Sequence, residues 1–135
     1  SELLDAPAGN GRVLLVEDEA LVQMLAIEHL EELGYRVETA GSATEAINKV
    51  RLINGQIDLA IVDVGLPDRK GDVLVGELRA LYPHLPIVIA SGYGEVDLRD
   101  RFGGDALISF LRKPYMRKDI EKAVSGVHKP RQGDR

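Results

Sequence analysis

The sequence predicts an α/β fold, a single doubly wound sheet of five parallel strands with helices on both faces. Short, mostly apolar runs, such as IDLAIVD at residues 57–63, where five of the first six residues are apolar, are typical of strands buried on both faces. Between these runs apolar residues recur about every 3.6 positions, which indicates helices. Strands that alternate with helices form parallel sheets through right-handed crossovers, and the expected flavodoxin-like strand order is 2-1-3-4-5.

The chain has the length of one domain. Its 135 residues are 44% hydrophobic, enough to fill a single core. We expect a linker at residues 1–11, where proline and glycine occur among small and acidic residues, and the folded domain at residues 12–127. The polar residues 128–135 are expected to be a flexible tail.

Composition excludes several classes of protein. With no cysteine there is no disulfide framework and no thiolate metal site, which fits a reducing compartment. No apolar run approaches the ~20 residues that span a bilayer, and the start of the chain lacks the pattern of a signal peptide. We therefore expect a cytoplasmic domain without membrane contact. A net charge of -5 argues against a nucleic-acid surface, which needs clustered basic residues.

The first half of the chain is expected to alternate strand and helix twice. The apolar run RVLLVE at residues 12–17 is too short for a helix and predicts a strand, and helical spacing follows at residues 20–33. Residues 35–39 predict a short strand, and the capping box SATE begins a helix at residues 42–53. The first helix carries a broad apolar face of the kind that packs on a core: Leu21, Met24, Leu25, Ile27, Leu30 and Leu33.

The second half, after the strand at 57–63, repeats the alternation. Apolar spacing predicts a helix at residues 72–82, which prolines close, and PIVIA at residues 86–90 predicts a buried strand. Residues 95–102 have only a weak helical pattern. A fifth strand is expected at residues 106–111, and a last helix at residues 118–127.

Acidic residues gather where the first and third strands end. Glu17 and Asp18 follow the first strand and Asp63 ends the third, and these strands are neighbours in the expected order. Like charges this close oppose folding unless a cation is present, so the cluster predicts a metal ion. Oxygen ligands from few protein groups suit Mg²⁺. Strand-end carboxylates are often helix caps or solvated acids, but here Ser91 and Lys113 reach the same edge.

A metal ion, a carboxylate, a hydroxyl and an ammonium around one cavity suit the handling of a phosphoryl group, because such catalysis depends on positioning and charge neutralisation. Asp63 is the expected nucleophile. Aspartyl phosphates are an established covalent form, and the sequence offers no activated serine or cysteine.

Four motifs occur together in the sequence and in a fixed order. They are Glu17-Asp18, Asp63 followed by Pro67 and Gly71, Ser91 at a strand end, and Lys113-Pro114. Together they resemble the receiver domain of two-component response regulators, and the resemblance covers roughly residues 12–127.

The resemblance implies a Mg²⁺-dependent phosphoacceptor. Asp63 would take a phosphoryl group from the phosphohistidine of a histidine kinase or histidine phosphotransfer domain. Such a domain is not a conventional enzyme, since it catalyses only its own phosphorylation and slow dephosphorylation. Asp18 and Asp63 would bind Mg²⁺ directly, Glu17 would act mostly through water, and the backbone carbonyl of Gly65 would complete the metal shell. Glu17 replaces the aspartate that is commoner in the family.

The resemblance also implies a conformational switch. Lys113 would pair with the phosphoryl oxygens, Ser91 would hydrogen-bond one of them, and the peptide before Pro114 would be cis. Phe110 occupies the position of the family's switch aromatic residue. Tyr93 either shields the phosphoryl group or caps the cavity.

Other interpretations remain open from the sequence. A degenerate receiver would use the same fold as a docking module without phosphorylation, although all the site positions are retained. A phosphatase of the haloacid-dehalogenase type would need a second aspartate where this chain has Gly65, and nucleotide binding would need a phosphate-cradling loop after the first strand. A single-domain regulator and a module of a hybrid sensor kinase fit equally, with a downstream protein or a homodimer as the output.

Overall fold

The computed structural model describes residues 11–92 and 98–127. Most of the predicted linker, the predicted tail and Tyr93 lie outside these residues. Strands and helices alternate along the described chain: β1 (Gly11–Val16), α2 (Ala20–Glu32), β2 (Tyr35–Ala40), α3 (Ala43–Leu52), β3 (Leu59–Asp63), α4 (Gly71–Leu81), β4 (Ile87–Ser91), α5 (Arg99–Phe102), β5 (Ile108–Arg112) and α6 (Arg117–Val127).

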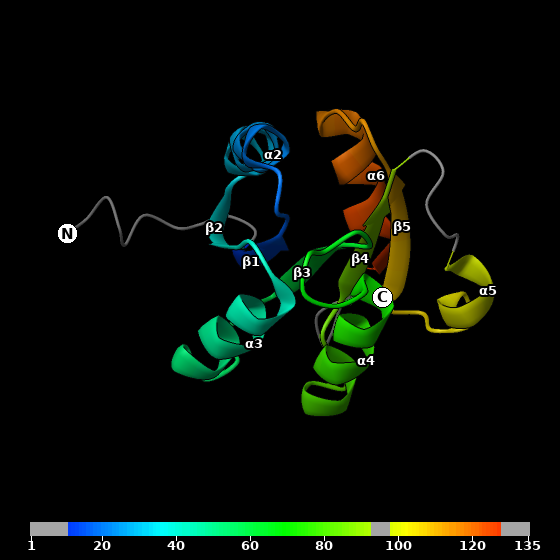
Figure 1. Cartoon of the computed structure of the whole chain (residues 1–135). Helices are drawn as coiled ribbons and strands as arrows, with labels where there is room; N and C mark the ends of the chain where they lie inside the picture. Colours follow the sequence, from blue (N-terminus) through cyan, green and yellow to red (C-terminus); the bar gives the residue numbers. More distant parts are fainter. Residues whose placement is uncertain (1–10, 93–97, 128–135) are drawn as a thin grey trace, which may run out of the picture.

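The strands form one parallel sheet in the order β2-β1-β3-β4-β5, which confirms the predicted fold class and topology. In Figure 1, α2 and α6 cover one face of this sheet, α3 and α4 cover the other, and α5 lies beside the edge strand β5. Strands β1 and β3 are hydrogen-bonded neighbours with helices running to opposite faces. This is the switch point at which an open α/β sheet forms its crevice.

The central strands supply side chains to two cores because successive side chains of a strand point to opposite faces. Leu14 and Val16 of β1 pack in the core under α3 and α4, whereas Val13 and Leu15 pack in the core under α2 and α6. All of β3 is buried, including Asp63 at its end. This confirms the predicted buried strand, which ends in one acid at the carboxyl edge of the sheet.

Helix α2 packs differently from its predicted apolar face. Leu21, Met24 and Leu25 have exposed fractions of 65%, 62% and 48%, whereas the buried residues of the helix are Ala26 and Leu30. The helix is apolar over more of its circumference than the sheet can cover. Only one stripe, completed by the half-buried Ile27 and Leu33, packs on the sheet. Three of the six residues of the expected apolar face are therefore exposed.

Two smaller features concern α5 and β5. Residues 95–97 of the weak helix expected at 95–102 lie outside the described residues, and the single turn α5 begins at Arg99. Strand β5 begins at Ile108 instead of residue 106 because Asp105 closes a turn, its Oδ1 accepting a hydrogen bond from the Leu107 amide at 2.8 Å. Within the described part of the chain the longest helix has 13 residues, too short to cross a bilayer.

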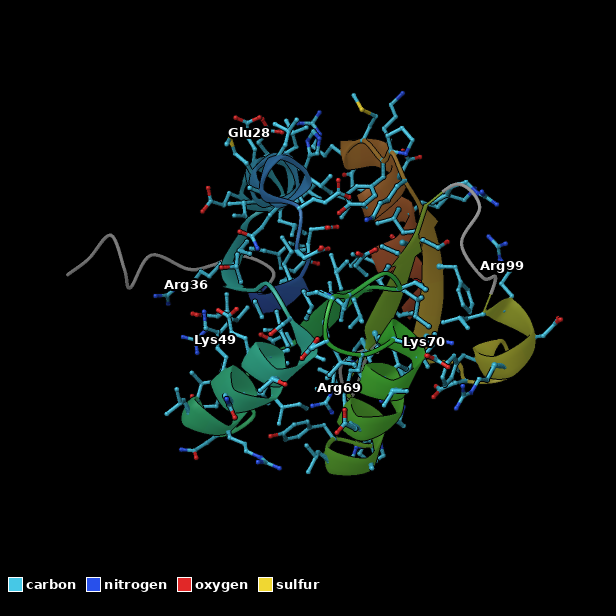
Figure 2. The ribbon with its side chains drawn as sticks, viewed as in Figure 1. Glu28, Arg36, Lys49, Arg69, Lys70 and Arg99 are labelled. Carbon is cyan, nitrogen blue, oxygen red and sulfur yellow. The ribbon has the colours of Figure 1, made fainter. Side chains whose placement is uncertain are left out.

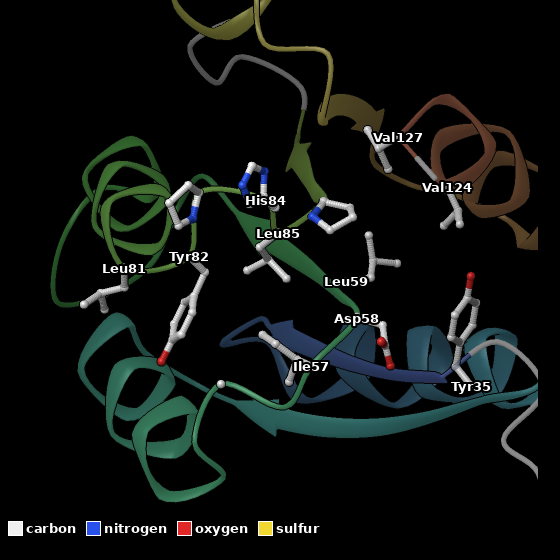
Figure 3. Close-up of a pocket in the computed structure, with 13 residues that line it drawn as sticks. Tyr35, Ile57, Asp58, Leu59, Leu81, Tyr82, His84, Leu85, Val124 and Val127 are labelled. Atoms are coloured by element: carbon white, nitrogen blue, oxygen red, sulfur yellow. The ribbon is translucent and has the colours of Figure 1, made fainter. Parts of the chain in front are cut away.

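A hollow of about 550 Å³ lies at the amino ends of the strands (Figure 3). Tyr35 and Tyr82 stand on opposite sides of it, and Asp58 and Leu59 at the start of β3 lie between them. This hollow is at the edge of the sheet opposite to Asp63 and is therefore separate from the acidic cluster.

Candidate functional site

The register of the sheet brings the predicted site residues to one edge. Val16 pairs with Val62, so Glu17 and Asp63 follow side by side at the ends of β1 and β3. Asp63 in turn pairs with Ala90, one residue before Ser91. Because parallel strands end at the same edge, residues far apart in the sequence converge there.

The three predicted acids form one cluster. Single carboxylate oxygens of Glu17, Asp18 and Asp63 all lie within 4.8 Å of one another. Glu17 and Asp63 are only 2% and 3% exposed, whereas Asp18 faces solvent. Buried like charges at this range destabilise one another, and an oxygen-only donor set with an open solvent side fits a hard divalent cation that keeps several waters. The residues present therefore fit Mg²⁺.

Lys113 places an ammonium group among these carboxylates. Its Nζ lies 2.8 Å from Asp63 Oδ1, 3.0 Å from Glu17 Oε1 and 3.9 Å from Glu19 Oε1. The Lys113 backbone is fixed as well, because its amide donates to the Ser91 carbonyl at 2.8 Å. The Lys113-Pro114 peptide is cis, which confirms the prediction from the resemblance.

The charges of this cluster shift the pKa of its members. Burial raises the pKa of Glu17, and the Asp63 charge adds to this, whereas the hydrogen bond from the Glu19 amide and the Lys113 charge oppose it. Burial alone would lower the pKa of Lys113, but its hydrogen bonds to Asp63 and Glu17 and their charges outweigh burial and raise it. The ammonium is thus held charged by the carboxylates that it neutralises.

Some neighbours of the cluster were not predicted from the sequence. Both carboxylate oxygens of Glu17 are engaged, since Oε1 contacts Lys113 and Oε2 accepts a hydrogen bond from the Glu19 amide at 3.1 Å. Gln23 on α2 donates to the Glu17 carbonyl at 2.9 Å. Tyr115 is buried beside the site, and burial together with the Glu17 charge raises its pKa to about 12, so it remains a neutral phenol. The sequence could have indicated that Tyr115 lies near the site, because it follows Lys113 by two residues.

The loop after Asp63 is tightly closed. The Gly71 amide donates to the Val64 carbonyl at 2.9 Å, which joins the two ends of the loop, and Leu66 is buried between them. A Cβ at Gly71 would lie 2.5 Å from the Asp63 carbonyl oxygen, so only glycine allows this approach. Gly65, the predicted carbonyl ligand, lies in this loop two residues after Asp63 and is exposed.

The sequence matches a known family of protein domains. The sequence profile of the response regulator receiver domain matches residues 13–125, which is most of the chain. The chain belongs to the receiver domain family. The resemblance inferred from the four motifs is confirmed.

Relatives of this receiver domain occur in proteins of different design. The chain is 35% identical over 117 residues to the sensor kinase CckA of Brucella abortus, covering 87% of the chain and 12% of that protein. It is 36% identical over 114 residues to the transcriptional regulatory protein PdtaR of Mycobacterium tuberculosis, covering 84% of the chain and 54% of that protein. The chain thus spans only part of these relatives.

Solved structures have the same fold. A response regulator receiver domain from Clostridium thermocellum superposes with a TM-score of 0.78 at 26% identity, covering 87% of this chain and 93% of that one. The architecture built here from strand register and burial is therefore the receiver architecture.

The two residues predicted to form the switch lie on neighbouring strands of the receiver domain. Ser91 ends β4 and is half-buried, and its register partner on β5 is Arg112. Phe110 is half-buried against the core under α3 and α4. The Arg99 guanidinium of α5 lies 5.5 Å from the centroid of the Phe110 ring, within the range of a cation–π contact.

Proposed function

We propose that this receiver domain accepts a phosphoryl group on Asp63 from the phosphohistidine of a histidine kinase or histidine phosphotransfer domain. The observation that carries the proposal is the buried Asp63 carboxylate, which contacts the Lys113 ammonium at 2.8 Å. Together with Glu17 and Asp18 it forms a carboxylate cluster that could hold a metal ion. An Asp63 oxygen would attack phosphorus and the phosphorus–nitrogen bond would break. The released imidazole would take up a proton.

The metal shell would come from a few residues. Asp18 and Asp63 would bind Mg²⁺ directly, and the Gly65 carbonyl would complete the protein's share. Glu17 would act through water, because Lys113 and the Glu19 amide already engage its two oxygens. When bound, Mg²⁺ would neutralise charge on the phosphoryl oxygens during transfer.

Lys113 and Ser91 would bind the product. A phosphoryl group adds about -1.5 to -2 charges beside Asp63. Lys113 is close enough to shift from the Asp63 carboxylate to a phosphoryl oxygen without unfolding the loop that carries it. Ser91 would donate a hydrogen bond from the end of the adjacent strand.

The movement of Ser91 would cause the side chain of Phe110 on β5 to turn inward. An inward turn of Phe110 would have to break its contact with the Arg99 guanidinium, so that the phosphorylated state would change the packing between α5 and the edge of the sheet. Packing, instead of a side-chain hydrogen bond, would hold Phe110 in each state.

The phosphodonor would dock beside the acidic cluster over α2. Leu21 lies three residues after Asp18 and is 65% exposed, and Met116 lies three residues after Lys113 and is 64% exposed. Exposed apolar side chains on α2 and directly before α6 favour a protein partner over a small molecule. The docking-only alternative is not favoured, because it gives no reason for the half-buried Lys113 beside the buried carboxylates of Glu17 and Asp63.

Labelling with a small acyl phosphate and Mg²⁺ tests this function. Wild type should gain the mass of one phosphoryl group, and Asp63→Asn should gain none. Asp58→Asn is the matched control, since Asp58 lies at the start of the same strand but at the opposite edge of the sheet. Equal labelling of Asp63→Asn and wild type would contradict the proposal.

A further inference from the structure

Asp68, in the loop between β3 and α4, binds a different element of the fold. Its Oδ1 accepts a hydrogen bond from the Ala43 amide at 2.9 Å, and its Oδ2 accepts one from the Thr44 amide at 2.8 Å. These amides begin α3, where backbone N–H groups have no partner within the helix. The two hydrogen bonds hold the pKa of Asp68 well below its usual range, so the carboxylate stays charged.

Asp68 adds to a cap that α3 already has. The Ser42 hydroxyl, directly before the helix, accepts a hydrogen bond from the Glu45 amide at 3.1 Å, which is the ordinary N-cap. Asp68 reaches the helix from 25 residues further along the chain. The helix therefore has a local cap and a distant one, and only the distant one belongs to the loop beside Asp63.

The next residue strengthens the attachment. Arg69 Nη1 lies 2.6 Å from Glu77 Oε1 on α4, and Arg69 Nη2 donates to Thr44 Oγ1 on α3 at 3.2 Å. Figure 2 shows Arg69 between these two helices. Two consecutive side chains thus fix the tip of the loop to both helices on this face of the sheet.

The loop that these contacts fix is the loop that carries Gly65. Its ends are joined by the hydrogen bond from the Gly71 amide to the Val64 carbonyl, and Leu66 anchors its first half in the core. Asp68 anchors its second half. A loop held in place before binding loses less conformational entropy when a ligand arrives, so these anchors favour binding at Gly65.

We propose that Asp68 is a positioning residue for the metal site, holding the Gly65 loop against the N-terminus of α3 so that loop and helix respond to metal together. The inference rests on the proposed function. Linkage makes the effect reciprocal: if the tether favours Mg²⁺ binding, Mg²⁺ must strengthen the tether. The first-turn amides of α3 then report on occupancy of a site to which α3 contributes no ligand.

Calorimetric titration of the full chain with MgCl₂ tests the proposal. Asp68→Ala removes both acceptors and should raise the Mg²⁺ Kd about fivefold, the low end of typical coupling between sites. Asp68→Asn keeps one acceptor oxygen and should fall between Asp68→Ala and wild type. Ser42→Ala is the matched control, since it removes a cap from the same helix without touching the loop, and its Kd should equal that of wild type.

Amide hydrogen exchange supplies an independent measurement. Mg²⁺ should slow exchange at Ala43 and Thr44 in wild type and in Ser42→Ala, but not in Asp68→Ala. If Asp68→Ala does not fold, the comparison of Asp68→Asn with Ser42→Ala decides the question.

The outcomes separate this inference from the proposed function. An unchanged Kd in folded Asp68→Ala, or equal weakening in Ser42→Ala, would overturn the positioning role while leaving the function intact. Absence of any Mg²⁺ binding by wild type would instead contradict the proposed function, and the inference would fall with it.

Discussion

Replacing Lys113 by methionine should destabilise the metal-free domain strongly. Methionine keeps an unbranched side chain of similar length but removes the ammonium, and it leaves Glu17 and Asp63 as carboxylates that are 2% and 3% exposed. Breaking a buried ion pair by removing one partner costs about 3–5 kcal/mol. The Lys113 side chain is 15% exposed and Asp18 faces solvent, so water can partly replace the lost ammonium. We therefore expect the free energy of unfolding to fall by about 3 kcal/mol.

Such a loss is large for a domain of this size. Native domains are stable by about 5–15 kcal/mol, so about 3 kcal/mol should be plain in urea unfolding followed by circular dichroism. The loss should shrink in mildly acidic buffer, where Glu17 can protonate, and in millimolar Mg²⁺, which supplies the missing cation. Adding Glu17→Gln to Lys113→Met should recover part of the stability by removing one buried charge.

Lys122→Met is the matched control, because Lys122 is an exposed lysine on α6. It should change the free energy of unfolding by no more than about 0.5 kcal/mol. If Lys113→Met proves as stable as Lys122→Met at neutral pH without metal, the assignment of Lys113 as the counter-charge of the buried acids is refuted.

Three further predictions concern pH, metal and coupling. The pKa of Glu17 is raised in the folded state, so this carboxyl stabilises the metal-free protein below its unfolded pKa of 4.5, and that stability is lost as pH rises through the folded pKa. Glu17→Gln should flatten this loss of stability in thermal melts across that pH range. An unaltered dependence of melting temperature on pH would contradict the assignment of the loss to Glu17. Asp18→Asn should stabilise the metal-free form slightly but abolish the Mg²⁺ response, which in wild type should reach about 2.7 kcal/mol at a hundredfold excess over Kd. Melts with and without Mg²⁺ measure this, and a response as large as that of wild type would refute direct ligation by Asp18. Ser91→Ala should still bind beryllofluoride at Asp63 without moving Phe110, and identical changes in Phe110 ring shifts in mutant and wild type would rule out the coupling.

The sequence predicts the sheet well because the signals for it are local. Each buried strand is a short apolar run, and the alternation of periods forces parallel crossovers, so the convergence of Glu17, Asp18 and Asp63 follows from strand order alone. The cluster of the three acids and the contacts of Lys113 with Glu17 and Asp63 agree with this expectation.

The sequence is a poorer guide to which side of a helix packs on the sheet. Periodicity shows that α2 is apolar but does not say which stripe the sheet covers, and three large apolar side chains are exposed as a result. Asp68 was missed for a different reason. Its partners Ala43 and Thr44 precede it by 25 and 24 residues, and that contact depends on the path of a loop that no periodic pattern encodes.

The measurement that tests the central claim most directly locates the phosphoryl group within the protein. After incubation with a small acyl phosphate and Mg²⁺, borohydride reduction should convert an aspartyl phosphate to homoserine, and peptide mass spectrometry should then find homoserine at position 63. Modification at Asp18 or at any other carboxylate with residue 63 intact, or no modification of wild type at all, would contradict the assignment of Asp63 as the phosphoacceptor.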